Sequence, residues 1–185
     1  QQTYEIPDTL TGNMQLIITP DNGYLLVGWA NAYNAIEEEW SYTKFYVVKT
    51  DSIGNRQWTR TYTYTGQPID VCYAHDGGYI ISGGSRIAGG NYDMTVIKID
   101  SIGGLVWQRN FGNPTKNDGA CATVPLTKKK YLVMGAIADT EPTGDFKSYF
   151  AILDSMGYTV FEKITANGYQ YGAAAWPVVV KDKVV

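Results

Sequence analysis

Residues 76–107 read DGGYIISGGSRIAGGNYDMTVIKIDSIGGLVW, and the landmarks of this stretch occur three times in the chain of 185 residues. Each copy has a turn followed by Tyr, then an apolar run that ends in Gly. An apolar segment ending in Asp-Ser-x-Gly follows, and an aromatic residue comes a few positions later. The first copy runs from Asp21 to Trp58 and the third from Lys129 to Phe161.

The spacing of these landmarks is regular. Tyr24, Tyr79 and Tyr131 are separated by 55 and then 52 residues. The three aspartates of the Asp-Ser-x-Gly segments, at positions 51, 100 and 154, are separated by 49 and then 54 residues. A period near fifty that contains four short strands is typical of β-propeller blades.

The repeat predicts an all-β chain: a β-propeller of four-stranded antiparallel blades, with about three and a half blades present. We expect blades at 14–66, 67–116 and 117–168, the start of a fourth blade at 169–185, and an outer closing strand within 1–10, at Gln2 to Ile6. Closed propellers have about four to eight blades, so ring closure should need further chain or a partner.

Within each blade the turn residues separate four predicted strands. The Asp-Asn-Gly and Asp-Gly-Gly turns supply the positive φ of a hairpin, and the later aspartates should accept hydrogen bonds from their own turns. The continuous apolar runs predict strands buried on both faces. The predicted strands are, for the first strand, 15–19, 71–74 and 121–126; for the third, 45–50, 95–99 and 149–153; and for the fourth, 57–62, 105–111 and 159–164.

Composition and charge narrow the function classes. The net charge of −3 argues against nucleic-acid binding, and no apolar stretch reaches the ~18 residues of a membrane span. Because the chain opens on Gln1, we expect removal of a signal peptide and export to the extracellular space or cell surface. Cys72 and Cys121 should be separate buried thiols on first strands, about 10 Å out of register.

The repeated pattern of Asp-Gly-Gly-Tyr, Val-Ile-Lys-x-Asp-Ser-x-Gly and Trp resembles a family of secreted bacterial β-propeller repeat proteins. Members of that family often carry a sorting domain for type IX secretion or a lipoprotein anchor. The resemblance implies export and a surface location, including the outer membrane, but no activity. The third copy departs from the pattern, with lysines at 128–130 in place of the acidic turn and Phe161 in place of Trp.

No residue pattern predicts catalysis, a metal or a cofactor. The single histidine, His75, flanks a turn, so neither a zinc site nor a histidine-based triad is supported. The Asp-Ser-x-Gly turns lack the ligand ladder of a calcium loop, which leaves only a fortuitous calcium.

The long connections after each second strand, at 29–44, 85–93 and 138–147, are the predicted recognition surface. An aromatic beside carboxylates can stack on a sugar ring and accept its hydroxyl hydrogen bonds, or anchor a protein. The alternative is that the Glu run at 37–39 is solvated and Trp40 packs on its own blade. The candidate ligand-binding residues are Tyr33, Glu38, Trp40, Tyr42, Arg86, Tyr92 and Asp93.

Three functional hypotheses follow. The first is an exported, non-catalytic binding or scaffold module with a glycan or protein partner. The second is a polysaccharide-active hydrolase or lyase, for which Glu38 with Asp93 or Asp118 would supply the paired carboxylates. The third is an accessory subunit of a cell-surface assembly.

Overall fold

The computed structural model describes residues 3–4, 9–34, 39–62, 65–86, 91–113, 115–119, 121–127, 129–140, 145–170, 179–180 and 183–184. Every regular element in these ranges is a β-strand. No helix long and apolar enough to cross a membrane occurs in this part of the chain.

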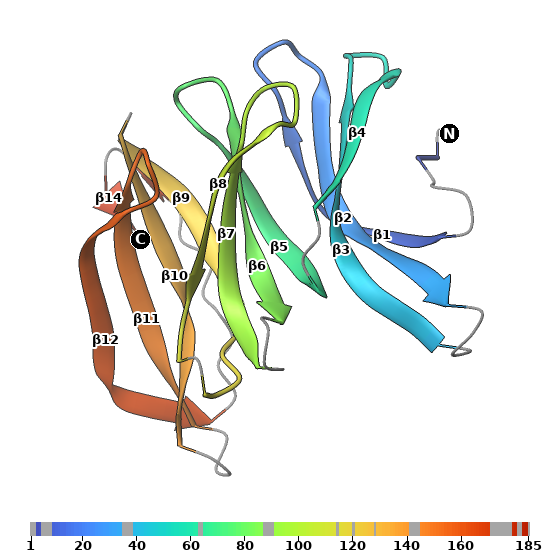
Figure 1. The fold of residues 1–185 in the computed structure, drawn as a ribbon. Helices are drawn as coiled ribbons and strands as arrows, with labels where there is room; N and C mark the ends of the chain where they lie inside the picture. The colour runs from blue at the N-terminus through green and yellow to red at the C-terminus, as the bar shows by residue number, and fades with distance from the viewer. Residues whose placement is uncertain are drawn as a thin grey trace.

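Twelve of the strands form three four-stranded antiparallel sheets that follow one another along the chain (Figure 1). Each sheet keeps chain order, so consecutive strands are hydrogen-bonded neighbours. The first sheet contains β1 (Thr9–Ile18), β2 (Tyr24–Asn34), β3 (Glu39–Thr50) and β4 (Arg56–Tyr62). The second contains β5 (Thr65–Tyr73), β6 (Tyr79–Arg86), β7 (Tyr92–Ile99) and β8 (Leu105–Phe111). The third contains β9 (Ala122–Thr127), β10 (Lys130–Thr140), β11 (Asp145–Asp154) and β12 (Thr159–Gln170).

The all-β class and the four-stranded antiparallel sheets are therefore confirmed. The three sheets are compatible with propeller blades, and the first strands β1, β5 and β9 contact one another in sequence. The described residues form no closed ring, so the propeller itself stays a prediction. The predicted fourth blade lies largely outside these residues, apart from a short pair of strands, β13 (Val179–Val180) and β14 (Lys183–Val184).

The turns behave as their residues predict. Asn22 and Gly77 take positive φ values of 59° and 96° in the turns before β2 and β6. The carboxylate of Asp100 accepts hydrogen bonds from the backbone N–H of Ile102 at 3.0 Å and of Gly104 at 2.7 Å. Asp51 and Asp154 accept equivalent bonds in their own turns.

The core lies between the sheets. Side chains along β7 point alternately to the two faces of the second sheet. Ile97 and Ile99 belong to the hydrophobic cluster shared with the first sheet, and Met94 and Val96 to the cluster shared with the third. Almost every residue of β6 and β7 is buried for this reason. The prediction that these apolar runs are covered on both faces is confirmed.

The aromatic landmark of one sheet contacts the Asp-Ser-x-Gly turn of the next sheet. Trp107 of β8 donates its indole N–H to the carbonyl of Ser155, in the turn before β12, at 3.0 Å. In the same turn Gly157 has φ 78°, and a Cβ added there would lie 2.9 Å from the Trp107 ring. Trp58 of β4 approaches Gly103 of the second sheet in the same way. The glycine therefore serves both the turn and the packing of the preceding sheet.

An ion pair joins two other landmarks within the first two sheets. The buried ammonium of Lys49 lies 2.7 Å from the carboxylate of Asp21, and Lys98 pairs with Asp76 in the same way. In the third copy Ile152 stands at the lysine position, and lysines replace the acidic turn. Both partners of the ion pair are thus replaced in the third repeat.

Of the predicted closing strand, Gln2 to Ile6, only Thr3 and Tyr4 are described, and neither belongs to a strand. The Tyr4 hydroxyl donates to the carbonyl of Gly54 at 2.5 Å. Tyr62 donates in the same way to Gly103 of the second sheet, at 2.8 Å. Tyr4 therefore occupies, on the first sheet, the place of a fourth-strand tyrosine from a preceding sheet.

Candidate functional site

The side chains of four of the seven predicted ligand-binding residues lie outside the described part of the structure. Glu38 lies outside the described residues. Tyr33 belongs to β2, and Trp40 and Tyr42 belong to β3, but only the backbone of these positions is described. The predicted connection at 29–44 is wrong in its extent, because β2 continues to Asn34 and β3 begins at Glu39, with Tyr33 paired opposite Trp40. A ligand site at these residues stays a prediction.

Arg86, Tyr92 and Asp93 lie at the paired ends of β6 and β7, where Arg86 is opposite Tyr92. The Tyr92 ring fills the space above Gly84, where an added Cβ would come within 2.2 Å of it. The backbone of Tyr92 also holds the β8–β9 connection, since its N–H donates to Asn117 at 2.9 Å and its carbonyl accepts from Asp118 at 2.5 Å. Tyr92 therefore links β6 and β7 to the β8–β9 connection.

Asp93 and Asp118 are both only 4% exposed. The Asp118 carboxylate accepts from the N–H of Ala138 at 2.8 Å and of Asn113 at 2.5 Å. Asp93 has a buried Oδ1 without a hydrogen-bond partner. Burial, followed by the nearby charge of Asp118, raises the pKa of Asp93. Of the carboxylates that the hydrolase hypothesis names, these two are therefore buried.

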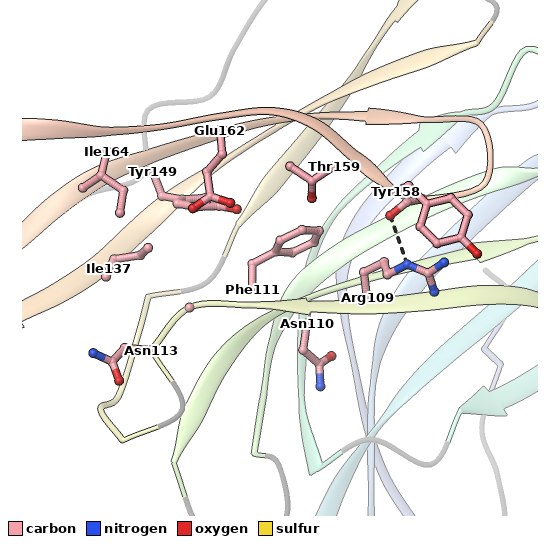
Figure 2. A pocket seen from close by; sticks show the side chains of 12 residues that line it. Arg109, Asn110, Phe111, Asn113, Ile137, Tyr149, Tyr158, Thr159, Glu162 and Ile164 are labelled. Atoms are coloured by element: carbon pink, nitrogen blue, oxygen red, sulfur yellow. Dashed lines mark hydrogen bonds between the residues drawn. The ribbon is translucent and has the colours of Figure 1, made fainter.

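A pocket of about 690 Å³ lies elsewhere, between the second and third sheets, and we call it the β8–β12 groove (Figure 2). It lies between the fourth strands of the two sheets, not among the long connections. Its lining residues are Arg109, Asn110, Phe111, Gly112, Asn113, Ile137, Tyr149, Gly157, Tyr158, Thr159, Glu162 and Ile164.

Strand pairing determines which side chains enter the groove. Glu162 and Ile164 of β12 stand opposite Ala151 and Tyr149 of β11, which face the second sheet. Cross-strand partners share a face, so Glu162 and Ile164 point the same way. From the other side, Phe111 projects from β8 toward β12, as Figure 2 shows.

The floor of the groove is aromatic. The rings of Phe111 and Tyr149 lie 6.0 Å apart, centre to centre, at an angle of 40°. Phe111 is half-buried, so one part of its ring packs on the core and another faces the groove. Ile137 of β10 and Ile164 extend the apolar surface at one end.

Arg109 closes the other end. Its guanidinium donates to the carbonyls of Gly157 at 3.0 Å, Met156 at 2.9 Å and Gln108 at 2.6 Å. It also lies 5.0 Å from the centre of the Tyr158 ring. Each of its three nitrogens thus donates to a backbone carbonyl, and Arg109 acts as a clamp between the sheets. Three of the five N–H donors of Arg109 are thus used within the protein, and two remain for a ligand.

Glu162 is the single carboxylate among the described residues that line the groove. The Tyr149 hydroxyl is its hydrogen-bond partner, and burial together with the negative charge of Glu162 raises the pKa of Tyr149. The hydroxyl therefore stays protonated and donates to Glu162. The exposed carboxylate keeps further lone pairs for a ligand.

Metal and thiol chemistry find little support in the described residues. No group of three or more His, Cys, Asp or Glu side chains gathers there at metal-binding range. The single histidine, His75, is exposed in its turn. Cys72 and Cys121 are free, and burial raises the pKa of the Cys121 thiol to about 12, so it is unreactive at neutral pH.

Sequence reasoning missed the groove because most of its residues lie on predicted strands or in the short turn before β12, outside the long connections. One difference between the third copy and the second could have indicated the groove. Glu162 stands where the second copy has Gln108, since both pair with equivalent positions of the third strands, Ala151 and Ile97.

No protein-family model matches this chain, and no curated protein matches it. The function is therefore inferred from the geometry of the fold and of the groove.

Proposed function

We propose that this chain is an exported, non-catalytic binding or scaffold module that recognises a glycan or protein partner on a rigid stack of β-sheets. The observation that carries the proposal is the β8–β12 groove, which combines an aromatic floor with one accessible carboxylate. Binding sites of small ligands typically have this composition: apolar walls with a few placed polar groups.

The groove favours binding over hydrolysis. Glycosidases of both stereochemical classes generally use two carboxyl groups that flank the scissile bond. Among the described residues of the lining no second acid lies beside Glu162, and Asp93 and Asp118 are buried. A polysaccharide held in the groove would therefore meet one acceptor and no catalytic pair.

Export and surface location rest on the repeat pattern. The Asp-Gly-Gly-Tyr and Asp-Ser-x-Gly landmarks resemble secreted bacterial propeller proteins, and the sheets they form are compatible with propeller blades. The net charge of −3 favours a neutral or protein partner over a nucleic acid.

A second candidate function is that of a subunit in a cell-surface assembly. Phe161 stands at the position that Trp107 occupies in the second sheet, where it pairs with Ile152. Trp107 is buried against the next sheet, whereas Phe161 is 50% exposed. An exposed apolar position on an otherwise repeated interface favours contact with a further protein surface.

One experiment distinguishes binding without catalysis from hydrolysis of the bound glycan. The immobilised protein is tested on glycan and protein arrays, and the bound glycans are then incubated with it and assayed for new reducing ends. Binding without product is the expected result. Release of reducing ends above the protein-free background would contradict a non-catalytic module.

A further inference from the structure

We propose that the β8–β12 groove binds a neutral oligosaccharide. This inference rests on the proposed binding function and names the class of its ligand. The groove offers three kinds of contact that a sugar chain uses: aromatic surface, a carboxylate acceptor and a hydroxyl, all on adjacent stretches of β8 and β12 (Figure 2).

The aromatic surface comes from two residues. Tyr158 is 62% exposed at one end of the groove, and the half-buried Phe111 lies in its middle. The Arg109 guanidinium over the Tyr158 ring holds that ring in place without covering all of it. The apolar face of a pyranose can pack on such a ring, while its hydroxyls stay free for polar contacts.

The polar contacts come from β12. Glu162 lies in the groove as an exposed carboxylate close to Tyr149. A carboxylate with unused lone pairs accepts hydrogen bonds from the adjacent hydroxyls of a sugar. The exposed Thr159 adds a hydroxyl that can donate or accept.

Charge selects against acidic ligands. Arg109 is the one cation among the described lining residues, and backbone carbonyls take three of its five N–H groups, which leaves two for a ligand. Glu162 adds a negative charge beside the bound chain. A uronic-acid chain would be repelled by Glu162, and only the two remaining N–H groups of Arg109 could compensate.

The shape agrees with a short chain of sugar rings. The volume of about 690 Å³ falls within the ~300–1,000 Å³ of small-ligand sites. The lining runs from Arg109 to Phe111 on β8 and continues to Asn113 in the connection that follows. An oligosaccharide can lie along this lining with one ring near Tyr158 and another near Phe111.

The test is isothermal titration calorimetry with the 185-residue protein. The neutral probes are tetrasaccharides of β-1,4-linked glucose, β-1,4-linked mannose and α-1,4-linked glucose, and the acidic probe is a tetrasaccharide of galacturonate. We expect at least one neutral tetrasaccharide to bind, and to bind about tenfold more tightly than the acidic one.

Two variants test the groove, each with a matched control. Tyr158→Ala and Glu162→Gln should each weaken binding by about tenfold, because each removes one contact with the sugar. Met156→Ala removes an exposed apolar side chain from the same turn, outside the groove lining. Lys163→Gln changes the neighbouring charge, and Lys163 pairs with Phe150 on the other face of β12. Both controls should bind like the parent protein.

Three outcomes would overturn the inference. Binding of a glycan that is unchanged in Tyr158→Ala and Glu162→Gln would place the site elsewhere and leave the proposed function intact. Loss of a protein or peptide partner in the same variants, without glycan binding, would reject the ligand class alone. Absence of any bound partner on the arrays and in calorimetry would reject the inference together with the proposed function.

Discussion

At the scale of the residue, the glycine of each Asp-Ser-x-Gly turn does two separate things. Gly157 adopts a φ of 78°, which L-residues with a side chain rarely take, and it leaves room for the Trp107 ring. Gly77 also has a positive φ, of 96°, but nothing lies within 4 Å of the position its Cβ would take. A substitution at Gly77 therefore introduces backbone strain alone, whereas one at Gly157 introduces strain and a clash with Trp107.

Substituting the two glycines should give different losses of stability. Gly77→Ala is expected to cost about 1–2 kcal/mol, the strain of a left-handed residue alone. Gly157→Ala carries that strain plus a clash with Trp107, for a total of roughly 3–4 kcal/mol. Urea denaturation followed by tryptophan fluorescence measures both. Equal losses would show that the Trp107 contact contributes nothing.

The pair of Asp21 and Lys49 predicts a pH dependence. The Lys49 hydrogen bond, followed by that of Thr19, lowers the pKa of Asp21 to about 2, below the 3.8 of a free aspartate. A depressed pKa stabilises the fold at pH values above about 4, and this stabilisation is lost as the pH falls through about 2.

Asp21→Asn should therefore lower the free energy of unfolding at pH 7 and have little effect at pH 2. The Asp21 side chain is 51% exposed while that of Lys49 is 4% exposed. Solvent screening of the carboxylate limits the loss to about 1–2 kcal/mol, although Lys49 would remain buried with one partner fewer. Chemical denaturation of both proteins at the two pH values gives the difference, which should shrink on acidification.

At the scale of the element, β7 and the β8–β9 connection bring together two buried carboxylates with opposite effects. Asp118 satisfies two backbone N–H groups, of Asn113 and Ala138, and so joins the connection to β10. Asp93 has an oxygen without a partner. Asp118 therefore links two elements, whereas the burial of the Asp93 carboxylate lowers the stability of the fold.

The two asparagine variants should consequently differ in sign. Asp118→Asn places an amide N–H against a backbone N–H and should cost about 2–3 kcal/mol. Burial raises the pKa of the Asp93 carboxyl group, so its charged form is disfavoured in the fold. Asp93→Asn removes this charge and should stabilise the protein by about 1 kcal/mol at pH 7.

A raised folded-state pKa weakens the fold as the pH rises above 3.8, so the benefit of Asp93→Asn should be absent at pH 3. Thermal melts at pH 3 and pH 7 check the sign and its pH dependence. A destabilised Asp93→Asn protein at pH 7 would show that the carboxylate makes a favourable contact.

At the scale of the whole molecule, the three sheets differ in how many of their faces are covered. The second sheet packs against the first and the third, and its Ile80, Met94 and Val96 are fully buried. In the third sheet the equivalent face is less well covered: Leu132, Phe150 and Ile152 are half-buried. In stacked repeats the stability of a unit depends on its neighbours.

Amide hydrogen exchange should follow this difference. We expect the central strands of the second sheet, β6 and β7, to exchange at least about tenfold more slowly than β10 and β11, which hold the same central place in the third sheet. Because all four strands are central, edge effects cancel. Exchange measured by mass spectrometry resolves these peptides, and equal protection would contradict the dependence on covered faces.

The residues that the sequence predicts correctly are those that act through neighbours in the chain. Asp100 bonds to its own turn, Asn22 and Gly77 form hairpin turns, and the apolar run of β6 is buried on both sides. The predicted strands of all three repeats lie in or overlap observed strands, although β1 and β12 extend further than their turn signals indicate.

The predicted site shows the limit of the same reasoning. Arg86, Tyr92 and Asp93 fall within the connection predicted at 85–93, but Arg86 belongs to β6 and the other two to β7. The Asp93 side chain is buried, and Tyr92 packs over Gly84. Whether a polar side chain near a loop faces solvent depends on the sheet packed beside it. That information is absent from the local pattern.

The amino-acid sequence alone determined that this protein is made of repeated four-stranded antiparallel units, since strand alternation, turn residues and repeat spacing are local properties of the chain. Only the tertiary structure decided that Phe111 and Glu162 border one groove and that Trp107 rests on Gly157. These contacts join different sheets, and they depend on how one sheet face is placed against the next, which no single repeat encodes.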